Sequence, residues 1–547
     1  MTSKRFAAVL ALALLALPPR VVDGQETRFR SSWKASDPAA ELTVRDSTIA
    51  LSLDDAVAIA LSQNLGLRIE RFQRARALFQ IQQELGIYDL ALSADAFSSS
   101  ETTPAVSSLE GAQQQMRENQ GLNVGFDQLV PIGGVASINW TNGRAETNSL
   151  FADINPSFNV GFDVLYSQPL LQSFGRLVTN RNLRVAEINS EVSVEDLEIA
   201  IAETIQQVEN AYWSLVEARQ QLAVDEESTA LANQLHEMNR IQVDVGTKAP
   251  LELIQSEVGI ATRQEQIIRS QAAVEDSADE LRRLLNLEGE QLWTASIEPV
   301  TDPETSRLEI DLEQSLRTAI DERPEVASQR LFLETLELDE RVFRKQKLPV
   351  LDLQLRYGYN GVGGDRRIRE DPDDIFNPDP EFTIVPGGID DAFQQIVDRE
   401  SDGWQVALNL RYPIQNRTAR ARATGASLAL EQGRTQLEDL LLSVRTEVRT
   451  AARGVQTAAQ QIDSAGKSRE LAERNLDAEQ KRYENGLSTS FQVLEIQEDL
   501  SLARSREVSA VTAYRRALVA YYRAIGLLLE ENGVVIEDEQ DFLELQP

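Results

Sequence analysis

The sequence contains no cysteine, which excludes disulfide bonds, thiolate metal sites and an amino-terminal cysteine that carries a lipid anchor. Its single histidine, His236, rules out a histidine metal cluster and a charge-relay triad. Basic residues are few: 54 Lys and Arg face 87 Asp and Glu, and the formal net charge is −33. Nucleic-acid binding needs clustered Lys and Arg against phosphate, so that class of function is excluded. We expect no enzyme, no cofactor and no metal site.

Long apolar runs are also missing, apart from a short one at the start of the chain. Lys4 and Arg5 precede the apolar run from Phe6 to Leu17, and small residues follow before an expected cut at Gln25. This pattern predicts a secretory signal peptide over residues 1–24. No later segment reaches the roughly 18 apolar residues that a transmembrane helix needs. The mature chain is therefore expected to be exported without a transmembrane helix.

Two parts of the sequence resemble each other at an offset of 240 residues. Gly246-Thr-Lys-Ala-Pro corresponds to Gly486-Leu-Ser-Thr-Ser, and residues 284–287 correspond to 524–527 at the same offset. A period this long that occurs only twice indicates a duplicated hairpin-rich module, not a solenoid of short units. The predicted organisation is a signal peptide (1–24), a first structural repeat (25–300), a second structural repeat (301–530) and an acidic tail (531–547).

Each repeat contains a long stretch with helical periodicity. From about 177 to 243 there is neither proline nor glycine, and Ile201, Ile205 and Val208 begin a seam with coiled-coil spacing. A continuous helix of this length would be about 100 Å long, because each residue adds ~1.5 Å. A second helix returns after each glycine turn. We therefore predict long antiparallel helical hairpins over about 177–287 and 418–529.

Other segments alternate apolar and polar residues with a period of two, which is typical of strands. The predicted strands are two within about 121–165 in the first repeat, and one each at about 349–360 and 403–413 in the second. The runs at 122–126 and 136–140 allow one bent strand pair, or residues 91–100 contribute instead. We count two strands per repeat, hence four per chain.

Alternation of this kind has two explanations. A soluble sheet with one wet face is the simpler one. Strand lengths of roughly 9–11 residues, aromatic residues at strand ends and an export signal instead match an outer-membrane barrel with a polar lumen. In lipid, four strands cannot close a barrel, and an open edge leaves backbone groups unpaired. The smallest single-chain barrels have about eight strands, so two chains would supply eight strands or three chains twelve.

Short motifs are spread over nearly the whole mature chain. They are Leu53-Asp-Asp-Ala-Val with Asn64, Gln168-Pro-Leu-Leu with Phe174-Gly, Ala211-Tyr-Trp-Ser-Leu, Val245-Gly246, Leu284-Leu-Asn-Leu and Tyr483-Glu-Asn-Gly486. Each motif is weak alone, whereas their order, spacing and duplication are specific. In these respects the chain resembles the TolC-like outer-membrane efflux proteins, also called outer membrane factors.

The resemblance implies a mainly helical fold with a membrane β-sheet, in which a homotrimer forms one continuous conduit. A twelve-stranded barrel would contact outer-membrane lipid, and a long α-helical barrel would extend into the periplasm. The implied partners are a periplasmic adaptor (membrane fusion) protein and an inner-membrane transporter. The implied function is the outer-membrane exit duct of a tripartite efflux or type I secretion system, which conducts substrates passively. The alternative is a structural coiled-coil tether of the envelope without transport.

The resemblance also implies functional residues near the two hairpin turns. Acidic residues after the second turn close the periplasmic end in the family, and the matching positions are Glu495 and Gln492, of which only Glu495 keeps the carboxylate. Three copies of Glu495 around a narrow axis would repel one another and would select cations. The alternative for Glu495 is an ordinary solvated helix residue. A tip latch joins an acidic residue to a tyrosine, here Glu252 and Tyr483, and Ser488 takes the place of the usual arginine.

The turns themselves match the adaptor-contacting grooves of the family. Their residues are Val245, Gly246 and Thr247 in the first turn and Asn485, Gly486, Leu487 and Ser488 in the second. The simpler interpretation is that both are ordinary glycine turns between helices. The two interpretations are compatible.

Overall fold

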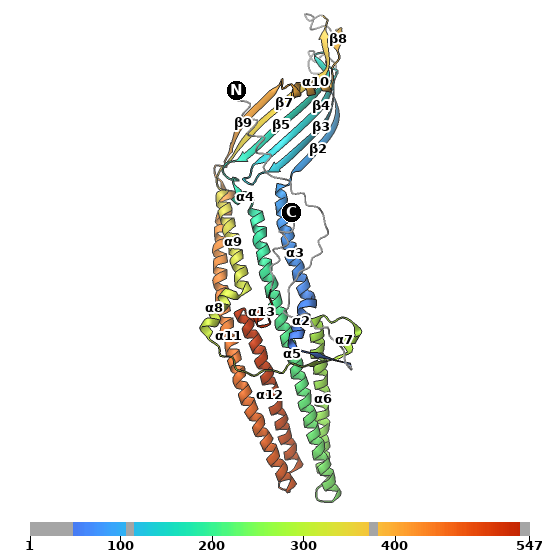
Figure 1. Cartoon of the computed structure of the whole chain (residues 1–547), viewed down its shortest axis with the longest axis vertical. Coiled ribbons are helices and arrows are strands. Elements are labelled where there is room, and N and C mark those ends of the chain that lie inside the picture. Colours follow the sequence, from blue (N-terminus) through green and yellow to red (C-terminus); the bar gives the residue numbers. More distant parts are fainter. Residues whose placement is uncertain (1–46, 105–113, 371–380, 536–547) are drawn as a thin grey trace. The chain divides into compact units, whose positions relative to one another are not determined.

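The computed structural model describes residues 47–104, 114–370 and 381–535. The predicted signal peptide lies outside the described residues, as does most of the predicted acidic tail. The chain divides into two compact units. We call them the sheet unit, which is Leu78–Ile188 with Leu333–Gly433, and the helical unit, which is the rest of the described chain. Figure 1 labels most elements of both units.

The sheet unit contains a seven-stranded antiparallel sheet (Figure 1). Its strands are β2 (Ala91–Pro104), β3 (Gln114–Leu129), β4 (Val135–Thr147), β5 (Ile154–Pro169), β7 (Val350–Arg369), β8 (Phe382–Val385) and β9 (Asp402–Arg411). The first four and β7 lie side by side in chain order, and β8 and β9 both pair with β7. Because β9 pairs with residues 350–359 of β7 and β8 pairs with 366–369, any one level of the sheet contains at most six strands.

The prediction of four strands per chain is wrong. The segment 121–165 contains parts of three strands, and β2 adds a fourth to the first half of the chain. Residues 130–134 form a tight turn, in which the Val130 N–H donates to the Gly134 carbonyl (2.7 Å), and not a bend within one strand. Residues 91–100, named above only as an alternative, form most of β2. Their strand signal is weak because the apolar face of β2 holds only one large side chain besides alanines, namely Leu92, before serine and threonine follow. Its pairing with β3, which sequence periodicity does not report, makes it a strand.

The sheet has one apolar and one polar face, since residues directly opposite each other in antiparallel strands share a face. One row across six strands is apolar: Leu92, Phe126, Ile138, Val164, Tyr357 and Trp404. The next row, on the other face, is Ser93, Gly125, Asn139, Asp163, Gly358 and Gly403. In membrane β-barrels the strands likewise place apolar side chains toward lipid on one face of the sheet and polar side chains toward water on the other.

A short helix, α10 (Ile389–Val397), covers part of the apolar face above these rows. It approaches β7 at two glycines: a Cβ on Gly361 would lie 2.0 Å from the Ala392 carbonyl oxygen, and one on Gly363 would lie 2.0 Å from that of Gly388. The Gln395 side chain bonds both the N–H and the carbonyl of Val362. The rest of the sheet unit is formed by η1 (Gly86–Tyr88), α4 (Arg176–Thr179) and the adjoining ends of longer helices.

The helical unit contains two long helix pairs. The first hairpin is α5 (Arg181–Asp244) with α6 (Pro250–Leu285), and the second is α11 (Arg417–Glu484) with α12 (Ser490–Ile525). The other elements are β1 (Thr48–Leu51), α2 (Leu53–Gln63), α3 (Leu65–Leu85), α7 (Glu290–Thr294), β6 (Ser296–Pro299), α8 (Leu312–Glu322), α9 (Pro324–Lys345) and α13 (Leu528–Glu531). Strands β1 and β6 pair in parallel. Within the described ranges, no helix combines the length and apolar character needed to cross a membrane.

The core of the helical unit follows the coiled-coil seams. Ile201, Ile205 and Val208 of α5 are all at most 4% exposed, and they pack with α2 and α6 in one cluster. Val448 and Val455 of α11 are buried in a second cluster with α12. Small residues line this second seam and allow the two helices to approach closely. A third, smaller cluster lies toward the hairpin turns and contains Leu235, Leu476, Tyr483, Val493 and Leu500.

Candidate functional site at the helical hairpin tips

The two hairpins turn in the same way. Gly246 and Gly486 have φ values of +76° and +73°, which favour glycine. The Thr247 N–H donates to the Gln242 carbonyl (2.9 Å), and at the same offset of 240 residues the Leu487 N–H donates to the Arg482 carbonyl (2.8 Å). Both are the six-to-one bond of a Schellman motif, which satisfies carbonyls at a helix end.

Large apolar side chains are exposed around both turns. They are Ile241, Val245, Leu251, Ile254 and Val258 in the first hairpin and Leu487 and Phe491 in the second; we call them the tip group. At the turns themselves, Val245 is 68% and Leu487 is 70% exposed. Soluble monomers seldom expose many large apolar side chains in one region, so such a group marks an interaction surface.

Gln492 and Glu495 have different surroundings at the start of α12. Thr489 caps the helix by accepting from the Gln492 N–H, and the Gln492 side chain accepts in return from the Thr489 N–H (3.3 Å). Gln492 is therefore part of a capping box that holds the helix end. Glu495 is exposed, and its carboxylate has no hydrogen-bond or ion-pair partner among the described residues.

Glu252 joins the two hairpins at their tips. Its carboxylate accepts from the backbone N–H of Ser490, the first residue of α12, over 3.1 Å. A carboxylate at this place satisfies a free N–H and interacts favourably with the positive end of the helix dipole. Ser490 is fully buried, so the contact lies within the interface between the hairpins.

Tyr483 joins the hairpins through a different partner from the one that the family resemblance implies. Its hydroxyl donates to the Asn239 side chain of α5 rather than to Glu252, and both Tyr483 and Asn239 are at most 1% exposed. The Asn239 amide donates in turn to the backbone carbonyl of Glu252 (3.3 Å). The Lys248 ammonium lies 3.5 Å from the centre of the Tyr483 ring, a cation–π contact. Glu252 and Tyr483 are thus linked through Asn239.

Ser488, where the resemblance implies an arginine, contacts residues of the second hairpin in the described chain. Its hydroxyl lies within bonding distance of Glu479 and of the Gln492 side chain. Glu479 is buried and pairs with Arg482 on the next turn of α11 (3.0 Å). A cationic side chain at position 488 is therefore not needed to balance Glu479.

Arg263 of α6 is a contact between the hairpins that the sequence analysis does not identify. It is 8% exposed and donates to the Ser228 hydroxyl (2.9 Å) and to the Leu494 carbonyl of α12 (3.4 Å). Its guanidinium also lies 3.7 Å from Glu498. Burial lowers the pKa of Arg263, and the nearby Glu498 opposes this shift. A signal was present: Ser256, Arg263 and Ser270 recur every seventh residue, a polar row on the buried face of α6.

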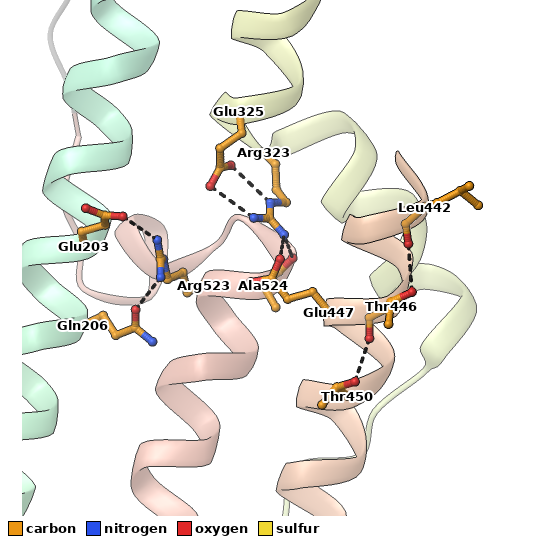
Figure 2. Close-up of polar contacts among 10 residues, drawn as sticks. All are labelled: Glu203, Gln206, Arg323, Glu325, Leu442, Thr446, Glu447, Thr450, Arg523 and Ala524. Atoms are coloured by element: carbon orange, nitrogen blue, oxygen red, sulfur yellow. Dashed lines mark hydrogen bonds and ion pairs between the residues drawn. The ribbon is translucent and has the colours of Figure 1, made fainter. Parts of the chain in front are cut away.

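Three acid–arginine pairs continue this contact along α5 and α12. They are Glu227–Arg504 (2.5 Å), Glu217–Arg516 (2.7 Å) and Glu203–Arg523 (3.0 Å). Figure 2 shows the last pair, in which Arg523 also donates to Gln206 (2.8 Å). Single exposed pairs contribute little, whereas a row of them favours one register of the two antiparallel helices. The row holds the first hairpin against the second over much of their length.

Arg323 anchors the end of α12 that lies away from the tip. It is 7% exposed and donates to Glu447 of α11 (2.7 Å), to Glu325 (3.2 Å) and to the Ala524 carbonyl (3.5 Å), as Figure 2 shows. Burial by itself lowers the pKa of Arg323, but the bonds to Glu325 and Glu447 outweigh it and the pKa is raised. The same pairing lowers the pKa of Glu325 against the effect of burial. These contacts hold the end of α12 that lies away from the tip against α11.

Comparisons with known proteins identify the family. A family model described as outer membrane efflux protein matches residues 57–287 and 315–527. The outer-membrane channel OprN has the same fold, with a TM-score of 0.62 at 15% identity over 93% of this chain and 99% of OprN. The CmeC outer membrane channel of Campylobacter jejuni aligns with a TM-score of 0.61 at 16% identity, over 96% of this chain and 97% of CmeC. The MtrE outer membrane channel of Neisseria gonorrhoeae aligns with a TM-score of 0.58 at 15% identity, over 93% of this chain and 98% of MtrE.

No curated protein matches the sequence. The family model nevertheless covers well over half of the chain, and the fold is that of outer-membrane channels with large helical periplasmic portions. This protein belongs to the outer membrane efflux protein family and is located in the outer membrane, with a large helical portion in the periplasm.

Proposed function

We propose that three copies of this chain form the outer-membrane exit duct of a tripartite efflux or type I secretion system. The observation that carries the proposal is a sheet with one apolar and one polar face and two edges without partners in the described chain. Lipid cannot satisfy the backbone groups of an open edge, so other copies must pair with them and close a barrel. The duct conducts passively and carries out no catalysis, because a partner pump supplies the energy.

The proposed architecture includes an internal two-fold repeat, 25–300 and 301–530, between a signal peptide (1–24) and an acidic tail (531–547). The matching bonds at the two hairpin turns support it, since they recur at an offset of 240 residues. The sheet departs from this symmetry, because the first repeat carries four of its strands and the second three. The two repeats therefore match in their helices, where α2 and α8 are both 11 residues long, and differ in the number of strands.

In the proposed trimer, Glu495 forms the periplasmic gate. Its carboxylate is exposed and unpartnered in the described chain, so it is free to face a symmetry axis. Three carboxylates close together repel one another and favour cations. Gln492 lies one helical turn nearer the tip and would form a second, uncharged ring, whose side chains are already held by the capping box.

Glu252 and Tyr483 form the proposed tip latch. The bond from Ser490 to Glu252 and the bond from Tyr483 to Asn239 both cross between the hairpins, so the tips separate only when these bonds break. Arg263 adds a third crossing contact on the same interface. Opening of the duct in this proposal is a separation of the second hairpin from the first.

The periplasmic adaptor docks at the two turns in this proposal. Val245, Gly246 and Thr247 form the first contact, and Asn485, Gly486, Leu487 and Ser488 form the second. The exposed tip group beside them supplies apolar area for a partner, and the similar backbone of the two turns would allow one adaptor surface to recognise both. A structural tether needs no sheet with a polar face, and no observation favours that function.

The test uses the full-length protein purified in detergent. Native mass spectrometry should give the mass of three chains, and the same sample should conduct ions when added to planar lipid bilayers. Heat-denatured protein provides the control for detergent-induced leaks. A monomer that produces no conductance would reject the proposal.

A further inference from the structure

The sheet contains two more full-length strands than the four per chain that the family resemblance implies. At the level of residues 350–359 of β7, the sheet consists of six strands: β2, β3, β4, β5, β7 and β9. The additional pair is the β3–β4 hairpin, which lies between β2 and β5. These two strands are 16 and 13 residues long, more than the roughly 9–11 residues that a tilted strand needs to cross a membrane.

The β3–β4 hairpin is paired with a neighbouring strand along both of its edges, β3 with β2 and β4 with β5. Its register with β2 runs through 14 residue pairs and that with β5 through 11, without a bulge. The apolar row of β2 and β5 continues through Phe126 and Ile138. A hairpin folded over one face of a smaller barrel would break both ladders and would hide this apolar row.

The polar face is also continuous across the hairpin. Asn123 of β3 donates to Asp95 of β2 (3.0 Å), and Asn139 of β4 donates to Asp163 of β5 (3.3 Å). Asp163 also pairs with Arg356 of β7 (3.1 Å). Gly125 lies between these side chains, and a Cβ there would approach the Ser93 hydroxyl to 2.7 Å. The side chains that bond across the sheet therefore depend on the hairpin's place in it.

The two edges of the six-stranded sheet are suited to pairing with each other. Strand β2 is exposed along its whole length, and neither β2 nor β9 contains lysine or an internal proline, the usual protection of a free edge. Their ladders with β3 and β7 are unbroken, so both edges are regular templates. Because the six strands alternate in direction, β2 and β9 run oppositely, and β9 of one copy can continue the antiparallel order into β2 of the next.

We propose that β2 of one copy pairs with β9 of the next, so that three copies of six strands close a barrel of eighteen strands. This inference rests on the proposed trimer, but its barrel has eighteen strands instead of the twelve that the family resemblance implies. Barrel diameter grows roughly in proportion to strand number, so this barrel is about one and a half times as wide as a twelve-stranded one. Its lumen is lined by the polar face, including Asp95, Asp127 and Asp163, and admits hydrophilic cargo of larger cross-section.

Disulfide formation in cell envelopes tests both parts of the proposal, because the natural chain has no cysteine. Ala94→Cys with Val124→Cys joins directly opposite residues of β2 and β3, at a Cα separation of about 4.5–5.5 Å that a disulfide tolerates. This pair should form an intramolecular bond. Ala94→Cys combined with Phe162→Cys of β5 should not, because two strands separate them. The reverse result would mean that the hairpin is outside the wall.

The edges are tested by combining Ala94→Cys with a cysteine at position 404, 406, 408 or 410 of β9. At least one combination should give covalent dimers and trimers on denaturing gels after mild oxidation. Ala407→Cys is the matched control, since residue 407 lies on the opposite face of β9 from 406 and should crosslink much less. Single-cysteine variants should stay monomeric on the same gels.

Electron cryomicroscopy of the purified complex gives the strand count directly. A trimer with eighteen strands is the expected result. A trimer with twelve strands, or with β2 crosslinked to β5, overturns this inference and leaves the proposed exit duct in place. A complex that is not a trimer overturns both.

Discussion

At the scale of single residues, Arg263 is the side chain whose removal should weaken the interface between the two hairpins. Its buried guanidinium bonds side chains and backbone of three helices. We predict that Arg263→Ala destabilises the hairpin interface by about 1–3 kcal/mol, because the Leu494 carbonyl and the Ser228 hydroxyl lose a charged donor. The basal conductance in planar bilayers should rise, and the melting temperature should fall.

Arg269→Ala is the matched control for this change. Arg269 lies on the same helix, is exposed, and among the described residues forms its one ion pair with Glu265, one turn away. Its loss should change the free energy of unfolding by less than about 0.5 kcal/mol. Equal effects of the two substitutions would show that Arg263 has no special role between the hairpins.

Glu495 is the residue on which the proposed gate depends. We predict that Glu495→Ala raises the basal conductance or lowers the preference for cations, because three negative charges would be removed from the axis of the proposed trimer. The effect should shrink at high salt, where such charges are screened. Asp499→Ala, one turn further along α12 and also exposed, serves as the control. Unchanged conductance and selectivity in the Glu495 variant would remove the gate assignment.

At the scale of elements, α5 carries a pH-dependent weakness near its start. Burial raises the pKa of Glu195 to about 7 from an ordinary value of 4.5, and repulsion from Glu198 and Asp196 adds to the shift. A group with a raised pKa holds its proton more tightly in the folded state. The contribution of protonated Glu195 to the free energy of unfolding is complete below about pH 4.5 and is lost as the pH rises through 7.

We predict that Glu195→Gln flattens the pH dependence of stability in this window, because glutamine stays neutral. The melting temperature of the variant should exceed that of the natural protein at pH 8 and approach it near pH 4.5. Glu191→Gln, on an exposed position of the same helix, should leave the pH profile unchanged. A profile that is equally steep in the Glu195 variant would mean that other carboxyl groups cause the dependence.

At the scale of the whole molecule, the sheet decides how the protein is held in the envelope. An apolar face in lipid is retained by the hydrophobic effect and by closed backbone pairing, which neither salt nor alkali removes. We predict that the protein stays in the membrane pellet after carbonate extraction and is released only by detergent. A tether held through its helices would appear in the carbonate supernatant, and that result would contradict an embedded barrel.

The elements with local signals could be predicted from the sequence. A long stretch without proline or glycine, with an apolar seam at Ile201 and Ile205, forms a helix by its own periodicity, and Gly246 and Gly486 mark turns because their backbone favours glycine. The family and the outer-membrane location are confirmed, and the resemblance behind both rested on the order, spacing and duplication of short motifs along the chain. Each motif is continuous in the sequence, so it can be recognised without knowledge of the fold.

Only the tertiary structure decided the features that depend on distant partners. The two faces of β2 differ little in hydrophobicity, and β2 is defined by its backbone pairing with β3. The number of strands counted from alternation alone is therefore wrong. Tyr483 bonds Asn239, a residue 244 positions away, and Arg263 meets Leu494 231 positions away. Hydrogen bonds of buried polar groups are set by which helices meet and in what register, and one chain's periodicity does not contain that information.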